Sequence, residues 1–142
     1  MTNLEKAKNI LSCSDYTCVV CSDTDVRMST LRGVAPLIEM LDSEIDLSSY
    51  SAADKVVGNG AAFLYVLLKI KELYAGVISR SAYKTLTDNN IPVVYDTIVE
   101  MISNRDNTGQ CPIEASVSGI NDPVEALSAI RKTLADLKLK SK

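Results

Sequence analysis

The sequence predicts one three-layer α/β domain over residues 1–142, with a mixed sheet of about four to five strands between layers of helices. The chain has 142 residues, 46% hydrophobic and 23% charged, which is typical of a globular protein with one core. Segments with a helical apolar period alternate with short β-type runs, as in parallel-sheet units. No linker, repeat or low-complexity segment interrupts this order, so a single domain is expected.

The N-terminal part predicts a helix, a hairpin and a second helix. An apolar helical stripe runs through residues 1–14 at Leu4, Ala7, Ile10 and Leu11. The run "YTCVVCSDTDVRMST" (16–30) is typical of two strands around an Asp-Thr-Asp turn. In "GVAPLIEMLDSE" (33–44) a proline stands where a first helical turn tolerates it, which predicts a short packing helix.

The remaining segments continue the alternation. The pattern of "SAADKVVGNGAAFLYVLLKIKE" (51–72) predicts a helix that starts near Asp54 and carries two glycines in its first turns. Next come a strand in "LYAGVIS", a helix in "RSAYKTLTDNN", a buried strand in "IPVVYD" and a short helix in "TIVEMISN". After a polar turn, "CPIEASVSG" and residues 122–140 predict two closing helices. The expected order is α-β-β-α-α-β-α-β-α-α-α.

Charge and hydropathy exclude several classes of partner. A net charge of -3 and a pI near 4.9 provide no basic field for nucleic acid or for an anionic membrane surface. The longest strongly apolar run, residues 61–68, is far shorter than the roughly 20 residues that cross a bilayer. Because the first residues carry scattered charges, they do not resemble a secretory signal, and a cytoplasmic location is expected.

The chain contains no histidine, which removes Ser-His-Asp and Cys-His arrangements and histidine-ligated metals. Its four cysteines follow the order of a plant-type iron-sulfur site. However, Cys18 and Cys21 lie three residues apart in a β-type run, where they should point to opposite faces of the strand. Buried, reduced thiols are therefore expected, and no metal or cofactor is predicted.

The polar stretch "NRDNTGQCPIE" ends in a cysteine at the start of a helix. Cys111 occupies the N-cap position, Pro112 the first helical position and Glu114 the third. A helix N-terminus stabilises a thiolate; Arg105 would add to this effect, whereas an ionised Glu114 would oppose it or accept a proton. The alternative is an inert, buried cysteine beside a salt bridge that joins Arg105 to Asp106.

Two motifs, "ADKVVG" (53–58) and "NRDNTGQCP" (104–112), carry a resemblance to a known family. The chain closely resembles, from about residue 17 to about residue 134, the uncharacterised bacterial family called domain of unknown function 1893, whose members look like cytidine deaminases in fold. This resemblance implies a cytidine deaminase-like fold and makes a homodimer plausible. Zinc deaminases place their ligands at the start of one core helix and at the next junction of strand and helix. "ADKVVG" and "ISRSAYK" are expected at these two places, and neither supplies a zinc ligand.

The two motifs are expected to form one cleft for a nucleotide-like or ADP-ribose-like ligand. Helix N-termini at strand ends favour phosphate groups, and Gly58 and Gly60 would permit a close approach of the backbone. Lys55 would face a phosphate and Asp54 a ribose hydroxyl; the structural alternative is that Asp54 caps a helix and Lys55 is solvated. The resemblance adds the remaining expected ligand-binding residues, namely Asn104, Arg105, Thr108 and Gly109.

Two function hypotheses follow, and whether the protein is an enzyme stays open between them. In the first, Cys111 is a nucleophile, Asp106 or Glu114 is the base, and Arg105 and Lys55 hold an anionic group. In the second, the same cleft only binds the nucleotide, in a sensor or an accessory subunit. A structural interaction domain without a small ligand is the third option.

Overall fold

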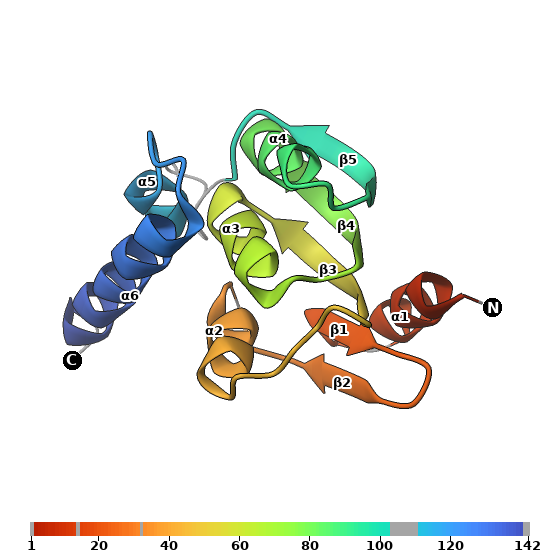
Figure 1. Ribbon diagram of the computed structural model, residues 1–142. Helices are drawn as coiled ribbons and strands as arrows, with labels where there is room; N and C mark the ends of the chain where they lie inside the picture. Colours follow the sequence, from red (N-terminus) through yellow and green to blue (C-terminus); the bar gives the residue numbers. More distant parts are fainter. Residues whose placement is uncertain (1, 14, 32, 103–110, 141–142) are drawn as a thin grey trace.

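The computed structural model describes residues 2–13, 15–31, 33–102 and 111–140 and confirms the three-layer α/β class (Figure 1). Its strands are β1 (Cys18–Cys21), β2 (Val26–Ser29), β3 (Ser51–Val57), β4 (Glu72–Ser79) and β5 (Val93–Val99). Its helices are α1 (Asn3–Ser12), α2 (Ala35–Asp42), α3 (Asn59–Leu68), α4 (Arg80–Asp88), α5 (Pro112–Ser116) and α6 (Pro123–Lys140).

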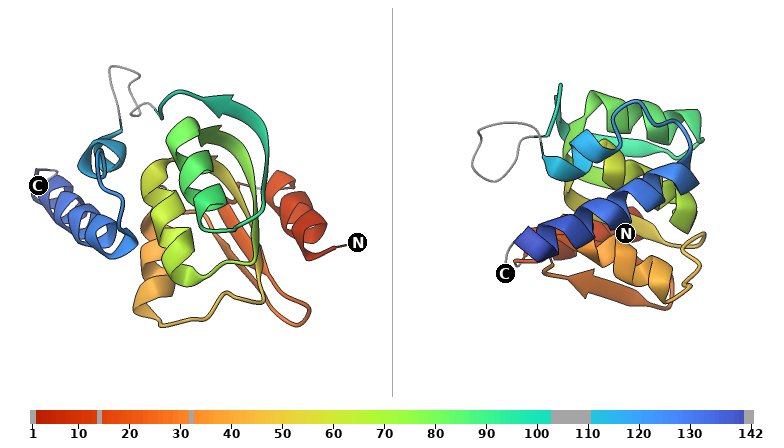
Figure 2. Two further views of the ribbon diagram at one scale, coloured as in Figure 1. Left: turned by 45° about the horizontal axis from the view of Figure 1, so that its top comes forward. Right: turned by 90° about the vertical axis from the view of Figure 1, so that its left-hand side faces the viewer.

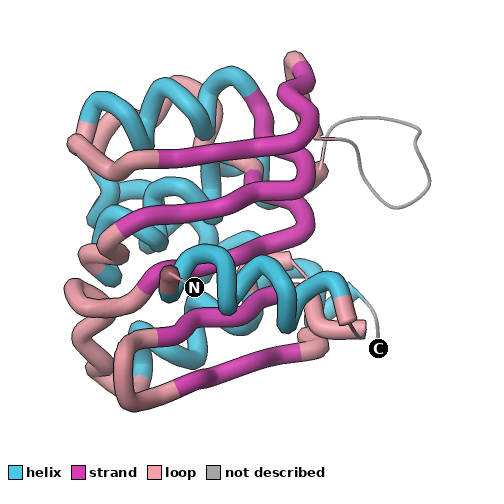
Figure 3. Tube along the Cα trace, turned by 90° about the vertical axis from the view of Figure 1, so that its right-hand side faces the viewer, coloured by secondary structure: helices cyan, strands magenta, loops and turns pink. Residues whose placement is uncertain are grey.

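The strands form one mixed sheet in the order β2-β1-β3-β4-β5. The β1–β2 hairpin is antiparallel, β1 pairs antiparallel with β3, and β3, β4 and β5 run parallel. Helix α1 lies across one face of the sheet (Figure 3), and α2, α3 and α4 cover the other. Helices α5 and α6 pack outside α3, on the side away from the sheet (Figure 2).

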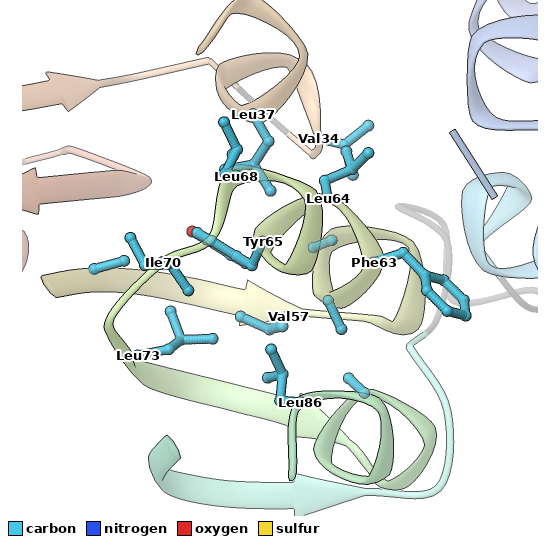
Figure 4. Close-up of a cluster of buried hydrophobic side chains, with 14 of the residues drawn as sticks. Val34, Leu37, Val57, Phe63, Leu64, Tyr65, Leu68, Ile70, Leu73 and Leu86 are labelled. Atoms are coloured by element: carbon cyan, nitrogen blue, oxygen red, sulfur yellow. The ribbon is translucent and has the colours of Figure 1, made fainter. Parts of the chain in front are cut away.

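The alternation within β1 divides the buried side chains between the two faces of the sheet. Cys18 and Val20 belong to the main core, which is shared with α2, α3, α4 and α6, whereas Val19 and Cys21 pack under α1. Cys18 and Cys21 therefore point to opposite faces, as the sequence predicted. Around Tyr65, the main core joins α3 to the sheet and to the flanking helices (Figure 4).

The predicted helix from Asp54 is wrong in its first part. Residues 51–57 form β3, the middle strand of the sheet, and the helix begins only at Asn59, with Gly58 as its N-cap. A strand covered on both faces shows a nearly continuous apolar run, which helical and strand periods fit equally well. The observed order is therefore α-β-β-α-β-α-β-α-β-α-α, with a fifth strand in the sheet.

The short helix predicted for residues 97–104 is also wrong over its described part. Thr97, Ile98 and Val99 complete β5 and pair with the end of β4. All three residues are β-branched, which favours a strand, and the parallel partner provides their hydrogen bonds. Consequently β5 reaches the same edge of the sheet at which β3 and β4 end.

The C-terminal helix packs through a few apolar positions. Ala126 and Ile130 are fully buried in the main core, and Arg131 forms an ion pair with Asp42 of α2 at 2.7 Å.

Among the described residues, no helix combines the length and the apolar character needed to span a membrane.

Candidate functional site

The candidate site lies where β3 ends and the N-termini of α2, α3 and α5 come together. A cavity of about 100 Å³ opens there, between the start of α3 and the start of α5. Its lining is mainly apolar and consists of Gly33, Val34, Val56, Gly58, Ala61, Ile102, Cys111, Ile113 and Glu114. The structure thus brings together three of the predicted site residues: Gly58, Cys111 and Glu114.

Glu114 occupies the N-terminus of α3 instead of pointing to solvent. Its Oε1 accepts a hydrogen bond from the Asn59 N–H at 2.8 Å, and its Oε2 accepts one from the Gly60 N–H at 2.9 Å. The side chain is buried, and its negative charge is favourable at the positive end of the helix dipole. The carboxylate of Glu114 therefore takes the place that the sequence analysis assigned to a ligand phosphate.

The two glycines of α3 are explained by α5. A Cβ atom at Gly58 would lie 2.5 Å from the carboxyl carbon of Glu114, and one at Gly60 would lie 2.7 Å from Cγ2 of Ile113. Both distances are too short for a side chain, so α3 can receive α5 only because these positions are glycine. The sequence predicted that a ligand or the sheet approaches the backbone at these glycines, and in the structure α5 does so.

Cys111 stands at the N-cap of α5, as its spacing from Pro112 and Glu114 predicted. Its backbone N–H donates to the Ile102 carbonyl at 3.0 Å, while its thiol makes no capping hydrogen bond. The residue is half-buried and lines the small cavity. Its sulfur atom is therefore not engaged in capping, and the residue borders the cavity.

Asp54 lies away from this cavity, beneath α3. Its Oδ2 accepts a hydrogen bond from the Tyr65 hydroxyl at 2.7 Å, and that hydroxyl lies 3.4 Å from the Cys18 sulfur. Burial raises the pKa of Asp54 to about 7, although the hydrogen bond from Tyr65 opposes this change. Burial, and then the charge of Asp54, raise the pKa of the Cys18 thiol. The three residues form a buried polar chain between β1, β3 and α3.

The expected helix cap at Asp54 is not present, because this residue lies inside β3. Lys55, the next residue, is exposed, and neither Asp54 nor Lys55 lines the cavity beside Cys111. The sequence pattern did not predict the hydrogen bond of Asp54 with Tyr65 or the proximity of Cys18 to the Tyr65 hydroxyl. An acidic residue within an apolar run was the available signal, and the helical assignment concealed it.

Five predicted site residues lie outside the described part of the chain. They are Asn104, Arg105, Asp106, Thr108 and Gly109. Their proposed roles stay predictions.

Because residues 51–57 form a strand, other segments than expected must be compared with the zinc-ligand positions of zinc deaminases. The helix after the hairpin is α2, which starts in "GVAPLIE", and the next junction of strand and helix lies in "VVGNGAA". Neither segment contains His or Cys. Within the described ranges, no group of three or more His, Cys, Asp or Glu side chains is placed to hold a metal ion.

Comparison with known proteins assigns a family. The model of the family "Domain of unknown function (DUF1893)" matches residues 6–134. The crystal structure of a DUF1893 family protein from Thermotoga maritima is similar to this chain, with a TM-score of 0.83 and 26% sequence identity. The similarity covers 96% of this chain and 91% of that one. No curated protein matches the chain.

Proposed function

The chain belongs to the DUF1893 family, and we propose that it binds a nucleotide-like small molecule in the cavity beside Cys111. The observation that carries this proposal is the convergence of three helix N-termini on a cavity at the end of β3. Ligands of open α/β sheets bind in the crevice beyond the carboxyl ends of the strands. A cytidine deaminase-like fold, implied by the family resemblance, is part of the proposal.

The size and the charge of the cavity indicate which part of the ligand would enter it. At about 100 Å³ it is smaller than the pockets of roughly 300–1,000 Å³ that bury whole drug-sized ligands. Its apolar lining suits a ring or another uncharged part, and the Glu114 carboxylate repels an anion at the start of α3. The base-like part of the ligand would enter the cavity, and its phosphate groups would face outward.

A Cys-dependent reaction is the second candidate function. The thiol of Cys111 is free of capping bonds and lines the cavity, which favours this candidate. Glu114 is less suited to the role of base, because both of its oxygens accept N–H groups of α3. Binding without turnover, in a sensor or an accessory subunit, is therefore the function that the described residues support best.

Thermal unfolding with nucleosides, nucleotides and ADP-ribose tests the binding site. Ligand at 100 times its Kd stabilises a protein by about 2.7 kcal/mol, which raises the Tm of a chain of this size by about 5 to 10 °C. Cys111→Phe should fill the cavity and abolish the increase in Tm. Cys13→Phe, at an exposed cysteine, is the matched control and should retain it.

Three outcomes separate the hypotheses. If no compound raises the Tm of the wild type, the binding proposal is wrong. If Cys111→Phe retains the full increase, the ligand binds elsewhere. Intact mass and product analysis identify an enzyme if a covalent adduct or conversion disappears in Cys111→Ser while binding persists.

A cytoplasmic location and a homodimer also belong to this proposal. The second is supported by the family resemblance alone. Sedimentation equilibrium of the purified chain measures its oligomeric state directly.

A further inference from the structure

We propose that a second cavity, between the β1–β2 hairpin and α2, binds an apolar α-amino acid or a similar zwitterion with an apolar body. This cavity has a volume of about 490 Å³, within the usual range of roughly 300–1,000 Å³ for small-molecule sites. It lies along the body of α2, whereas the cavity beside Cys111 lies at the N-terminus of that helix. The two sites are therefore separate.

The hairpin forms one wall of the second cavity. Cys18 pairs with Ser29 and Val20 pairs with Arg27, so these four side chains project from the same face of the sheet. All four residues line the cavity. The register of the hairpin thus fixes which groups a ligand meets on this side.

Helix α2 forms the opposite wall without closing onto the hairpin. Val34, the N-cap of α2, and Leu37 are directed toward Leu64 and Leu68 of α3 (Figure 4). This packing turns a different side of α2 toward the hairpin. The residues that line the cavity from this side are Pro36, Glu39, Met40, Asp42, Ser43 and Ile45.

The floor of the cavity is apolar, whereas polar residues make up nearly half of its whole lining. Val20 is 1% exposed and Cys18 is 3% exposed at the hairpin wall, and Met40 and Ile45 are half-buried opposite them. An aliphatic or aromatic side chain of a ligand would replace water against Met40 and Ile45, which is favourable at about 25 cal/mol per Å² of apolar surface buried.

Opposite charges stand at the exposed rim of the two walls. Arg27 extends from the hairpin, and its Nε donates to Asp25 at 3.0 Å; Asp25 in turn accepts from the Tyr50 hydroxyl at 2.6 Å. A guanidinium anchored through Nε can present its terminal nitrogens to a carboxylate in bidentate geometry. The structure thus places a restrained cation where an anionic group of a ligand would arrive.

The helix wall supplies the complementary anion. Asp42 is engaged by Arg131 at 2.7 Å, whereas Glu39 forms no ion pair with any residue in the described ranges. The charge of Glu39 is therefore available to an ammonium group. Since Glu39 and Asp42 repel phosphate, this arrangement favours a zwitterion over a nucleotide.

Isothermal titration calorimetry with leucine, methionine and phenylalanine tests the proposal on the full chain. Saturable binding is expected, and Arg27→Gln and Glu39→Gln should each weaken it by about tenfold or more, as for the loss of a charge-assisted hydrogen bond. The matched controls Arg80→Gln and Glu125→Gln make the same charge changes at exposed positions away from the cavity and should leave the Kd unchanged.

Ligand derivatives assign each charge to its partner. Leucinamide lacks the carboxylate, so its weaker binding should not respond to Arg27→Gln; N-acetylleucine lacks the ammonium group and should not respond to Glu39→Gln. Absence of saturable binding of all three amino acids overturns the proposal, as does leucine binding that is unchanged in both cavity variants. These results are independent of the nucleotide test, which uses substitutions of Cys111.

Discussion

Replacement of Asp54 by asparagine should remove a pH-dependent loss of stability. The side chain is buried beneath α3, and an asparagine carbonyl can still accept the hydrogen bond from Tyr65. The substitution therefore keeps the shape and the main hydrogen bond and removes the ability to ionise, while its amide nitrogen replaces the oxygen that accepts the long hydrogen bond from the Val56 N–H at 3.4 Å. The free energy of unfolding of the variant should change little with pH between 5 and 8.

The magnitude follows from the pKa of Asp54, which burial raises from 3.8 to about 7. Between these two values the folded state keeps a proton that the unfolded chain has lost, so the stability falls as the pH rises and the loss is complete above the folded pKa. A difference of one in pKa corresponds to about 1.4 kcal/mol, which gives a total loss of about 4 kcal/mol. About 2 to 3 kcal/mol of this is lost between pH 5 and pH 8.

In the described part of the chain, no other group has a pKa that is shifted into this pH window. There is no histidine. The pKa of Asp25 is lowered, mainly by the hydrogen bond from Tyr50, and that of Asp46 by hydrogen bonds with Ser48, so both act in the acid range. The pKa of Cys18 is raised from its ordinary value of 9.0, so its thiol ionises above the window. The slope of stability with pH should therefore report on Asp54.

Urea unfolding at several pH values measures the effect. The wild type should lose about 2 to 3 kcal/mol from pH 5 to pH 8, or about 5 to 10 °C in Tm, and Asp54→Asn should be the more stable protein at pH 8. Asp88→Asn, at an exposed aspartate, should retain the wild-type slope. Parallel pH profiles for wild type and Asp54→Asn would refute the reasoning.

Two further substitutions test the packing around the candidate site. Glu114→Gln replaces one acceptor oxygen by a donor that faces an N–H of α3. Urea unfolding should therefore show that the free energy of unfolding falls by about 1.5–3 kcal/mol. A decrease as small as that of the exposed control Glu125→Gln would contradict the capping role. Gly76→Ala places a Cβ 2.7 Å from the Lys55 carbonyl oxygen in the neighbouring strand, so the sheet must shift at a cost of about 1–3 kcal/mol. Unchanged stability of Gly76→Ala would show that β3 and β4 separate more easily than their pairing indicates.

Sequence patterns within one helical turn predicted the start of α5, which forms one side of the site. The spacing of Cys111, Pro112 and Glu114 predicted a helix start, and α5 begins there. The same rules did not predict the acceptor role of Glu114 at α3, because Asn59 and Gly60 lie far away in the sequence. A capping residue can be recognised within one turn, whereas a cap supplied by a distant helix depends on how the helices pack.

The sequence by itself determined the α/β class, the hairpin, most of the helices and the absence of histidine chemistry. These features depend on composition and on periods of a few residues, which the chain displays locally. Only the tertiary structure decided that residues 51–57 are the middle strand, and thereby that Asp54 is buried against Tyr65. An apolar segment adopts the strand form when neighbouring strands satisfy its backbone hydrogen bonds on both sides; for residues 51–57 these are the antiparallel β1 and the parallel β4, which come from other parts of the chain.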